Sequence, residues 1–443
     1  MLLYRVLSVL ALIAYSPYAL VRSALGRRRL GDIRGRLGLA PYPDLDGGIW
    51  VHAVSVGEVG AACNLLAALT QKLPGARLGL SVTTAAGLEA ARRVAGESIA
   101  VFSFPLDLAG PVEKALSAVR PGLIVLTETE LWPLVLERAR ARGVPVALVN
   151  GRISDRSFRR YLLLRGWFRR VLGNVSLFAM QTEEDARRIE RLGARPERIL
   201  VTGNIKYDLA PAPPFADAAR LTCAAAGRPI LVAASTGEGE EQMVLEAWKG
   251  LDPRPLLVLA PRRPERFDGV ARLIESSGFT VVRRSTPDPA ATNHKSQITT
   301  HESLVYLLDS IGELASLYGE AFLAFLGGSL IATGGHNPIE AWAQGVAVLV
   351  GPNTGNFREI TRAGQRLGIL ECVADTRELG RAFDRAVRDP AAATARGDRA
   401  RRFVAESRGA AASTADSVAG LLRSGHRPGE GPANRRRERA AAP

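Results

Sequence analysis

The stretch GLIVLTETELWPLVLERARARGVPVALVNG, residues 122–151, decides the fold. Its two apolar runs, 122–129 and 144–151, have the length of buried strands, and the segment between them has the apolar spacing of a helix that ends at Gly143. Parallel strands need a crossover connection, and a helix is the usual one. The stretch therefore predicts an α/β unit with a parallel sheet.

The same alternation of strands and helices extends from this stretch in both directions. Further strands are expected at 49–56, 77–84, 177–181 and 198–204, and, after a proline-rich linker at 209–217, at 229–236, 255–261, 280–285, 304–309, 321–328 and 346–352. We predict two facing, doubly wound, Rossmann-like domains, at 31–208 and 209–424. Open α/β sheets bind ligands beyond the carboxyl ends of their strands, so two such domains suit an enzyme with two substrates.

The net charge of +14 over 443 residues is concentrated at the two ends of the chain. Seven arginines face one acid within residues 1–36, and five face two within 425–443. The body between them is close to balance, which argues against a nucleic-acid partner. Residues 425–443 show no apolar periodicity and are expected to form a disordered basic tail.

Residues 1–21 are almost entirely apolar, and arginines follow them at once. This order predicts a membrane-anchor helix within residues 1–30 that crosses the bilayer once, with the arginines and the body on the cytoplasmic side. The alternatives are a cleaved signal peptide, which would place the charge before the apolar run, and a buried helix of a soluble protein.

A second basic segment lies inside the chain, at residues 152–170. It contains seven arginines with interleaved aromatic and leucine side chains. As a helix it would be amphipathic and basic, which suits a membrane surface or an anionic lipid. An ordinary surface helix, with its apolar side on the core, explains the same pattern.

Charged residues follow three of the strands predicted for the first domain. Glu58 comes directly after the first strand, Glu128 and Glu130 flank Thr129 at the end of the strand at 122–129, and Lys206 precedes the linker. Carboxylates at this edge suit acid–base chemistry. Each residue also has an ordinary explanation, because acids favour helix starts and exposed lysines are common.

In the second domain, Pro261 and Arg262 end a strand, and arginine is a good phosphate ligand. The segment GGSLIATGGHNPIEAWAQG, residues 327–345, is rich in glycine, which lets the backbone approach a ligand closely. We expect Asn337 to cap, and Pro338 to open, a helix whose free N–H groups bind a phosphate.

Within the same segment, the helix is expected to begin at Ile339, and Glu340 in its first turn is placed to bind ribose hydroxyls. The chain lacks the phosphate-binding motif GxxxxGK[ST] and the dinucleotide-binding motif GxGxxG, and its histidines and cysteines show no metal-ligand spacing. We therefore expect no cofactor and no metal.

These motifs occur together, in one order, in a known family. HAVSVGE (52–58), TETELWP (127–133), GNIKYD (203–208), APRRPERF (260–267), IGELASLYG (311–319) and the segment 327–345 resemble the bacterial 3-deoxy-D-manno-oct-2-ulosonic acid (Kdo) transferases of lipopolysaccharide synthesis. The resemblance runs from about residue 30 to residue 420.

The resemblance implies a GT-B fold and transfer of Kdo from CMP-Kdo to the lipid A precursor, lipid IVA, at the bacterial inner membrane, by an inverting and metal-independent route. It implies that Glu58 is the general base and that Glu128 and Lys206 stabilise the transition state. The CMP contacts that it implies are Pro261, Arg262, Ile311, Gly312, Glu313, Asn337, Pro338, Ile339 and Glu340.

Two positions depart from the family pattern. Gly237 and Arg263 stand where the family usually has histidine, and Gly237 removes a polar side chain near the donor. These departures affect the details of donor contact more than the activity itself. A second hypothesis keeps the fold and assigns another inverting, membrane-associated GT-B glycosyltransferase, with a different sugar nucleotide or lipid acceptor. A third hypothesis is a non-enzymatic binder of anionic lipid or nucleic acid.

Overall fold

The computed structural model describes residue 4, residues 33–286 and residues 303–424. The chain divides into two compact units, one made of residues up to Asp208 together with those from Ser407 onward, and one made of Leu209–Glu406. Each unit is described by itself below.

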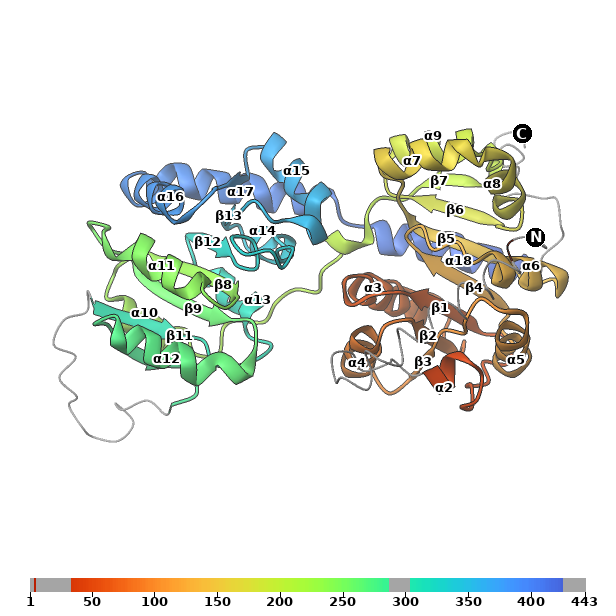
Figure 1. Cartoon of the computed structure of the whole chain (residues 1–443), viewed down its shortest axis with the longest axis horizontal. Coiled ribbons are helices and arrows are strands. Elements are labelled where there is room, and N and C mark those ends of the chain that lie inside the picture. The colour runs from red at the N-terminus through yellow and green to blue at the C-terminus, as the bar shows by residue number, and fades with distance from the viewer. Residues whose placement is uncertain (1–3, 5–32, 287–302, 425–443) are drawn as a thin grey trace, which may run out of the picture. The chain divides into compact units, whose positions relative to one another are not determined.

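The first unit contains a seven-stranded parallel sheet with the order β3-β2-β1-β4-β5-β6-β7 (Figure 1). Its strands are β1 (Ile49–Ala53), β2 (Leu78–Val82), β3 (Ile99–Ser103), β4 (Leu123–Thr127), β5 (Val146–Gly151), β6 (Leu177–Met180) and β7 (Ile199–Val201). The chain begins in the middle of the sheet, builds one side to β3, and returns through β4 to build the other, which is the doubly wound arrangement that the sequence predicts.

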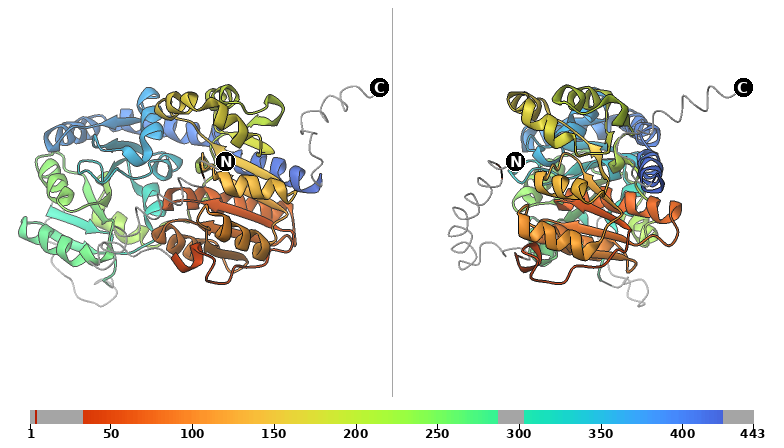
Figure 2. Two further views of the ribbon diagram at one scale, coloured as in Figure 1. Left: turned by 45° about the vertical axis from the view of Figure 1, so that its right-hand side comes forward. Right: turned by 90° about the vertical axis from the view of Figure 1, so that its right-hand side faces the viewer.

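Helices cover both faces of this sheet (Figures 1 and 2). They are α2 (Ile33–Arg36), α3 (Val56–Lys72), α4 (Ala85–Val94), α5 (Ala109–Val119), α6 (Pro133–Ala141), α7 (Asp155–Leu163), α8 (Arg165–Leu172), α9 (Glu183–Leu192) and α18 (Ala410–Arg423), with short 3₁₀ turns η1 (Pro196–Arg198) and η2 (Ile205–Tyr207). Alternate strand residues serve the two faces: Ile49 and Val51 pack with α3 and α18, whereas Trp50 packs with α5 and α6. Burial on both faces explains why these strands read as continuous apolar runs.

The second unit repeats this plan, with the strand order β10-β11-β9-β8-β12-β13-β14. Its strands are β8 (Ile230–Thr236), β9 (Leu256–Pro261), β10 (Thr280–Arg283), β11 (Leu304–Leu307), β12 (Leu323–Leu326), β13 (Ala347–Val350) and β14 (Leu370–Cys372). Its helices are α10 (Ala218–Ala225), α11 (Glu240–Lys249), α12 (Phe267–Ser276), α13 (Leu314–Leu317), α14 (Ile339–Ala343), α15 (Arg358–Arg366), α16 (Thr376–Arg388) and α17 (Pro390–Glu406), with 3₁₀ turns η3 (Pro264–Arg266), η6 (Tyr318–Glu320) and η7 (Gly355–Phe357). All strand pairs are parallel.

The last described helix, α18, belongs to the first unit, whereas the sequence analysis placed it in a second domain running to residue 424. Ala415 and Val418 of α18 are buried in the same core as α3. The Asp208 carboxylate accepts hydrogen bonds from the backbone N–H groups of Gly409 and Ala411, both at 2.6 Å. Asp208 therefore fixes the start of α18 at the point where the chain leaves the first unit.

The segment 152–170, expected as one helix, forms α7 and α8 with a break at Leu164. Phe158 and Trp167 pack against the core, as in an ordinary surface helix. No helix in the described ranges is long and apolar enough to cross a membrane. Apart from Tyr4, the predicted anchor at 1–30 lies outside the described residues, and so does the tail at 425–443.

Candidate active site

Glu58 lies in the first turn of α3, directly after β1, and its side chain is 8% exposed. One carboxylate oxygen accepts from the Ser55 hydroxyl at 3.0 Å. The other accepts from the Val54 backbone N–H at 2.8 Å and from the Thr127 hydroxyl at 3.2 Å. The Glu58 carboxylate thus connects the start of α3 to the backbone after β1 and to the end of β4, while the Ser55 side chain makes no cap hydrogen bond to the helix. All three donors are neutral, so the carboxylate is held without a cation.

Burial raises the pKa of Glu58 above its usual value, and the neighbouring charge of Glu128 raises it further, against the lowering effect of the hydrogen bond from Val54. A carboxylate with a raised pKa is a stronger base. The environment of Glu58 thus suits the proton-accepting role that the resemblance implies.

Glu128 follows the last residue of β4 and has a φ of +55°. Its carboxylate lies 2.5 Å from the Lys206 ammonium, and both side chains are mostly buried. Lys206 lies in η2, whose backbone is held by two asparagines: Asn150 accepts the Ile205 N–H and Asn204 accepts the Lys206 N–H, both at 3.0 Å. The structure therefore brings Glu128 and Lys206 together as a pair, although 78 residues separate them in sequence.

Glu130 is a third carboxylate at this edge, and the sequence analysis did not count it among the catalytic residues. Burial raises its pKa to about 7, with further contributions from the charges of Glu58 and Glu128. Of the three carboxylates at this edge, Glu130 is the one whose pKa lies near neutral pH, and a strongly raised pKa of this kind is common in functional sites. The pairing of Glu128 and Glu130 at one strand end was the signal in the sequence.

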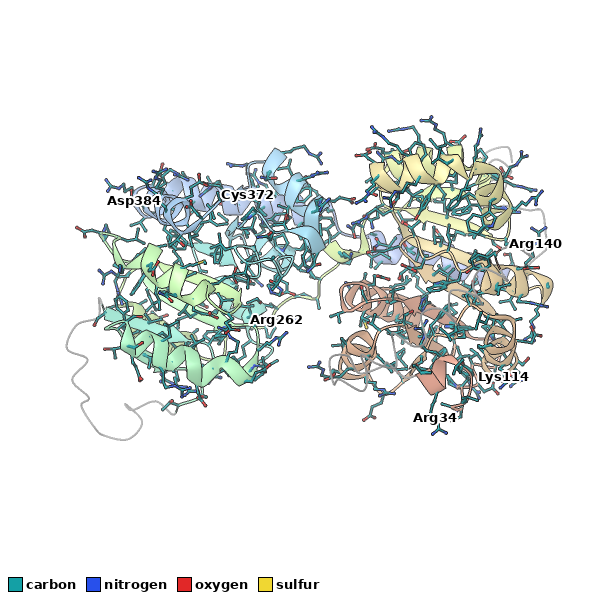
Figure 3. All side chains as sticks on the ribbon, in the orientation of Figure 1. Arg34, Lys114, Arg140, Arg262, Cys372 and Asp384 are labelled. Atoms are coloured by element: carbon teal, nitrogen blue, oxygen red, sulfur yellow. The ribbon has the colours of Figure 1, made fainter. Side chains whose placement is uncertain are left out.

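In the second unit, Pro261 is the buried last residue of β9, and Arg262, directly after it, projects into solvent at the edge of the unit (Figure 3). Burial, together with the charge of Arg262, lowers the pKa of His336 to about 4. Burial also raises the pKa of Glu340, against the lowering effect of Arg262. These interactions place Arg262 beside the segment that carries His336 and Glu340.

Ile311, Gly312 and Glu313 follow β11, the neighbour of β9 in the sheet. Ile311 is 64% exposed, and Gly312 has a φ of +94°, which favours glycine. Glu313 accepts a hydrogen bond from Ser310 and one at 2.9 Å from Arg284. Burial would raise the pKa of Glu313, but these two hydrogen bonds outweigh it and keep the carboxylate charged.

The helix begins at Ile339, as expected, but the segment 337–340 differs from the expectation in the place of Pro338 and in the length of the helix. The backbone assigns Pro338 to the N-cap and Ile339 to the first helical position, and α14 has only five residues. The Asn337 side chain accepts the Ile339 N–H at 3.1 Å. This helix start therefore offers a phosphate fewer free N–H groups than the sequence suggested, and Arg262 is the stronger anion-binding group at this edge.

The structure shows what surrounds the two positions that depart from the family pattern. A Cβ atom on Gly237 would lie 2.4 Å from the Cδ1 atom of Ile331, so the isoleucine occupies the space that a larger residue would use. Arg263 is exposed and lies 3.9 Å from Glu265.

Comparison with known proteins places the sequence in one family. The family described as 3-Deoxy-D-manno-octulosonic-acid transferase (kdotransferase) matches residues 31–209. Proteins named 3-deoxy-D-manno-octulosonic acid transferase are 35% identical to this chain: that of Haemophilus influenzae covers 88% of this chain and 90% of its own length, and that of Bordetella pertussis covers 87% and 90%.

Among solved structures, the glycotransferase of kitacinnamycin is 14% identical, with a TM-score of 0.51 over 87% of this chain and 100% of its own. That likeness concerns the fold alone, two Rossmann-like α/β units in one chain. The two relatives, together with the family match, lead to one assignment: the chain belongs to the 3-deoxy-D-manno-octulosonic acid transferases, glycosyltransferase enzymes of lipopolysaccharide synthesis.

Proposed function

We propose that this enzyme transfers Kdo from CMP-Kdo to lipid IVA, the lipid A precursor, with inversion at the anomeric carbon and without a metal. The observation that carries the proposal is the environment of Glu58: a mostly buried carboxylate with a raised pKa, held by neutral donors, next to the Glu128–Lys206 pair. Such a transfer needs a base that takes the proton of the attacking sugar hydroxyl. It also needs a group that stabilises the charge that develops in the transition state.

In the proposed reaction, Glu58 takes the proton of the acceptor hydroxyl while that oxygen forms a bond to the anomeric carbon of Kdo. The bond from this carbon to the phosphate oxygen of CMP breaks, and the pair of electrons leaves with CMP. Attack on the face opposite the leaving group inverts the configuration. Lys206, held in place by Glu128, supplies a fixed positive charge for the transition state.

The second unit supplies the proposed donor site. Arg262 binds the phosphate of CMP, because its guanidinium is exposed at the edge that also carries Glu340, whose pKa its charge lowers. Glu340 accepts hydrogen bonds from ribose hydroxyls. Pro261, Ile311, Gly312 and the segment 337–339 line this site from the ends of β9, β11 and β12, whereas Glu313 acts by fixing its own loop through Arg284.

The α7–α8 region supports the proposal that the enzyme works at the cytoplasmic side of the inner membrane. Leu163 and Leu164, at the junction of the two helices, are 84% and 59% exposed. They are surrounded by exposed arginines at positions 156, 159, 160, 165, 169 and 170. Apolar side chains amid arginines suit a surface with anionic headgroups.

Tyr4 lies against the same region, since its hydroxyl donates to Asp107 at 2.7 Å and its ring lies 6.2 Å from that of Trp167. We therefore propose that the apolar N-terminal segment, which contains Tyr4, and the α7–α8 junction reach the same membrane. The acyl chains of the acceptor would remain in that membrane while its sugar headgroup is modified.

The test is transfer of radiolabelled Kdo from CMP-Kdo to a tetraacylated, bisphosphorylated glucosamine disaccharide, with EDTA present throughout. We expect turnover by the wild type and a loss of about 10²–10⁴-fold in kcat for Glu58→Gln. Glu97→Gln, an exposed carboxylate on the same unit, is the matched control and keeps the wild-type rate.

A wild-type rate for Glu58→Gln would remove the proposed base. Turnover that requires added Mg²⁺ would contradict the metal-independent route. Transfer from a different sugar nucleotide, with no product from CMP-Kdo, would favour the second hypothesis of the sequence analysis and would agree with the missing polar side chain at Gly237.

A further inference from the structure

The loop after β12 contains three consecutive backbone N–H groups that point to one place, those of Gly328, Ser329 and Leu330. Gly328 has a φ of +66°, which turns the backbone so that these groups converge. A concavity of successive N–H groups is a common binding site for anions such as phosphate. In this chain, the carboxylate of Glu240 occupies the concavity.

Glu240 is the first residue of α11, and its side chain is inaccessible to solvent. One oxygen accepts from Ser329 at 3.0 Å and from Leu330 at 2.9 Å; the other accepts from Gly328 at 2.6 Å and from Gly237 at 2.8 Å. Gly237 follows β8, the neighbour of β12 in the sheet. A single carboxylate thus joins the ends of two adjacent strands through four charge-assisted hydrogen bonds.

The loop fits closely around this carboxylate. A Cβ atom on Gly327 would lie 2.5 Å from the Cα atom of Thr236 and 2.8 Å from the Oε2 atom of Glu240, so only glycine is tolerated there. With four N–H groups committed and no side chain between the loop and β8, a phosphate from outside has no access to these donors.

The same loop leads directly to the proposed donor residues. The carbonyl oxygen of Gly328, whose N–H is held by Glu240, accepts from the Gly335 N–H at 2.7 Å and from the Thr333 hydroxyl at 2.9 Å. Gly335 precedes His336 and Asn337. Two consecutive hydrogen bonds, from Gly328 to Glu240 and from Gly335 to Gly328, therefore connect Glu240 to the segment that carries Asn337 and Glu340.

We propose that Glu240 is a positioning residue of the donor site, an internal anion that shapes the loop after β12 and so presents Asn337 and Glu340 beside Arg262. It follows that the donor phosphate binds Arg262 and not the N–H groups of residues 328–330. The inference rests on the proposed function, in which this edge of the second unit binds CMP.

The experiment compares binding of CMP and of cytidine to the full chain by isothermal titration calorimetry. Glu240→Gln keeps the shape of the side chain but turns an NH₂ group toward two N–H donors, so we expect both ligands to bind at least tenfold more weakly. Arg262→Ala should weaken CMP to the level of cytidine and leave cytidine unchanged.

Asp107→Asn is the matched control, because Asp107 is also a buried carboxylate that accepts two backbone N–H groups, those of Leu134 and Val135, but lies in the first unit. It should lower the melting temperature and leave CMP affinity within twofold of the wild type. A general effect of destabilisation would instead weaken CMP binding in both variants and overturn the proposal.

The outcomes distinguish a failure of the proposed CMP site from a failure of the role proposed for Glu240. A wild type that does not bind CMP refutes the proposed donor site. A wild type that binds CMP, with Glu240→Gln equal to it or weakened for CMP alone, refutes the role of Glu240. If Glu240→Gln does not fold, Gly328→Ala tests the same loop with the carboxylate retained. The added Cβ atom would lie 3.0 Å from the Nε2 atom of His336 and would therefore displace the segment that precedes Asn337. An unchanged CMP affinity in that variant overturns the proposal.

Discussion

Replacing Glu130 by glutamine is expected to stabilise the enzyme at pH 8 and to have a much smaller effect at pH 5. The pKa of Glu130 is about 7 in the folded chain, against an ordinary value of 4.5. Between these two values the unfolded chain releases its proton first, so rising pH favours unfolding. The loss of folding stability caused by Glu130 is nearly absent below pH 4.5 and reaches its full size above pH 7.

The size of the effect follows from this difference. A pKa that is higher by about 2.5 corresponds to an upper bound of about 3 kcal/mol of lost stability, because each tenfold change in proton affinity contributes roughly 1.4 kcal/mol. Glu130 is only partly buried, and water screens its repulsion from Glu58 and Glu128. We therefore expect a gain of about 1–2 kcal/mol at pH 8 for Glu130→Gln.

Urea unfolding of the wild type, Glu130→Gln and the exposed control Glu97→Gln, at pH 5, 6, 7 and 8, measures this gain through the shift of the midpoint at constant slope. The gain should grow with pH and level off near pH 8, while the control stays flat. A gain that is the same at every pH, or no gain at pH 8, would show that burial and the neighbouring charges do not raise the pKa of Glu130 as described.

Two further substitutions test other parts of the molecule. Leu164→Glu should weaken co-sedimentation with vesicles that contain anionic lipid by about tenfold, since it removes an exposed apolar side chain and adds a repelled charge; CMP binding is the control, and vesicle binding equal to the wild type contradicts the proposed membrane surface. Gly237→His should lower stability by about 1–2 kcal/mol through overlap with Ile331, and Ile331→Ala in the same chain should restore most of it. Thermal unfolding of Gly237→His, Ile331→Ala and the double variant measures this overlap. If the losses of stability in the two single variants simply add up in the double variant, the overlap with Ile331 is not the cause.

The central strands of both sheets could be predicted because burial on two faces leaves them almost entirely apolar. The sequence analysis missed β3 and β14, which lie at the edges of their sheets, where one neighbour is absent and the apolar run is short. The break at Leu164 was also missed, since the apolar spacing of 152–170 continues through it. Periodicity reports which residues face a core, not where a helix is interrupted.

The candidate site, too, could be predicted only in part from the sequence. Glu58, Glu128 and Lys206 could be chosen in advance because charged residues stand directly after strands, in motifs with a familiar order. The pairing of Glu128 with Lys206 needed the fold, since it depends on how η2 is placed by Asn150. Glu240 reads in the sequence as one of several acids at a helix start, and only the convergence of four N–H groups distinguishes it from Glu241, which binds Arg266 instead.

The return of α18 to the first unit has a consequence for biosynthesis. In topological terms, the second unit is an insertion within the first, which is completed only by residues 410–423. The ribosome therefore finishes the second unit, which is one continuous segment, before the first unit receives the helix α18 that packs against α3. The side of α3 (Val56–Lys72) that α18 covers therefore stays uncovered until Ala410–Arg423 has been synthesised, after the whole second unit, which reverses the amino-terminal-first order in which most multidomain proteins mature.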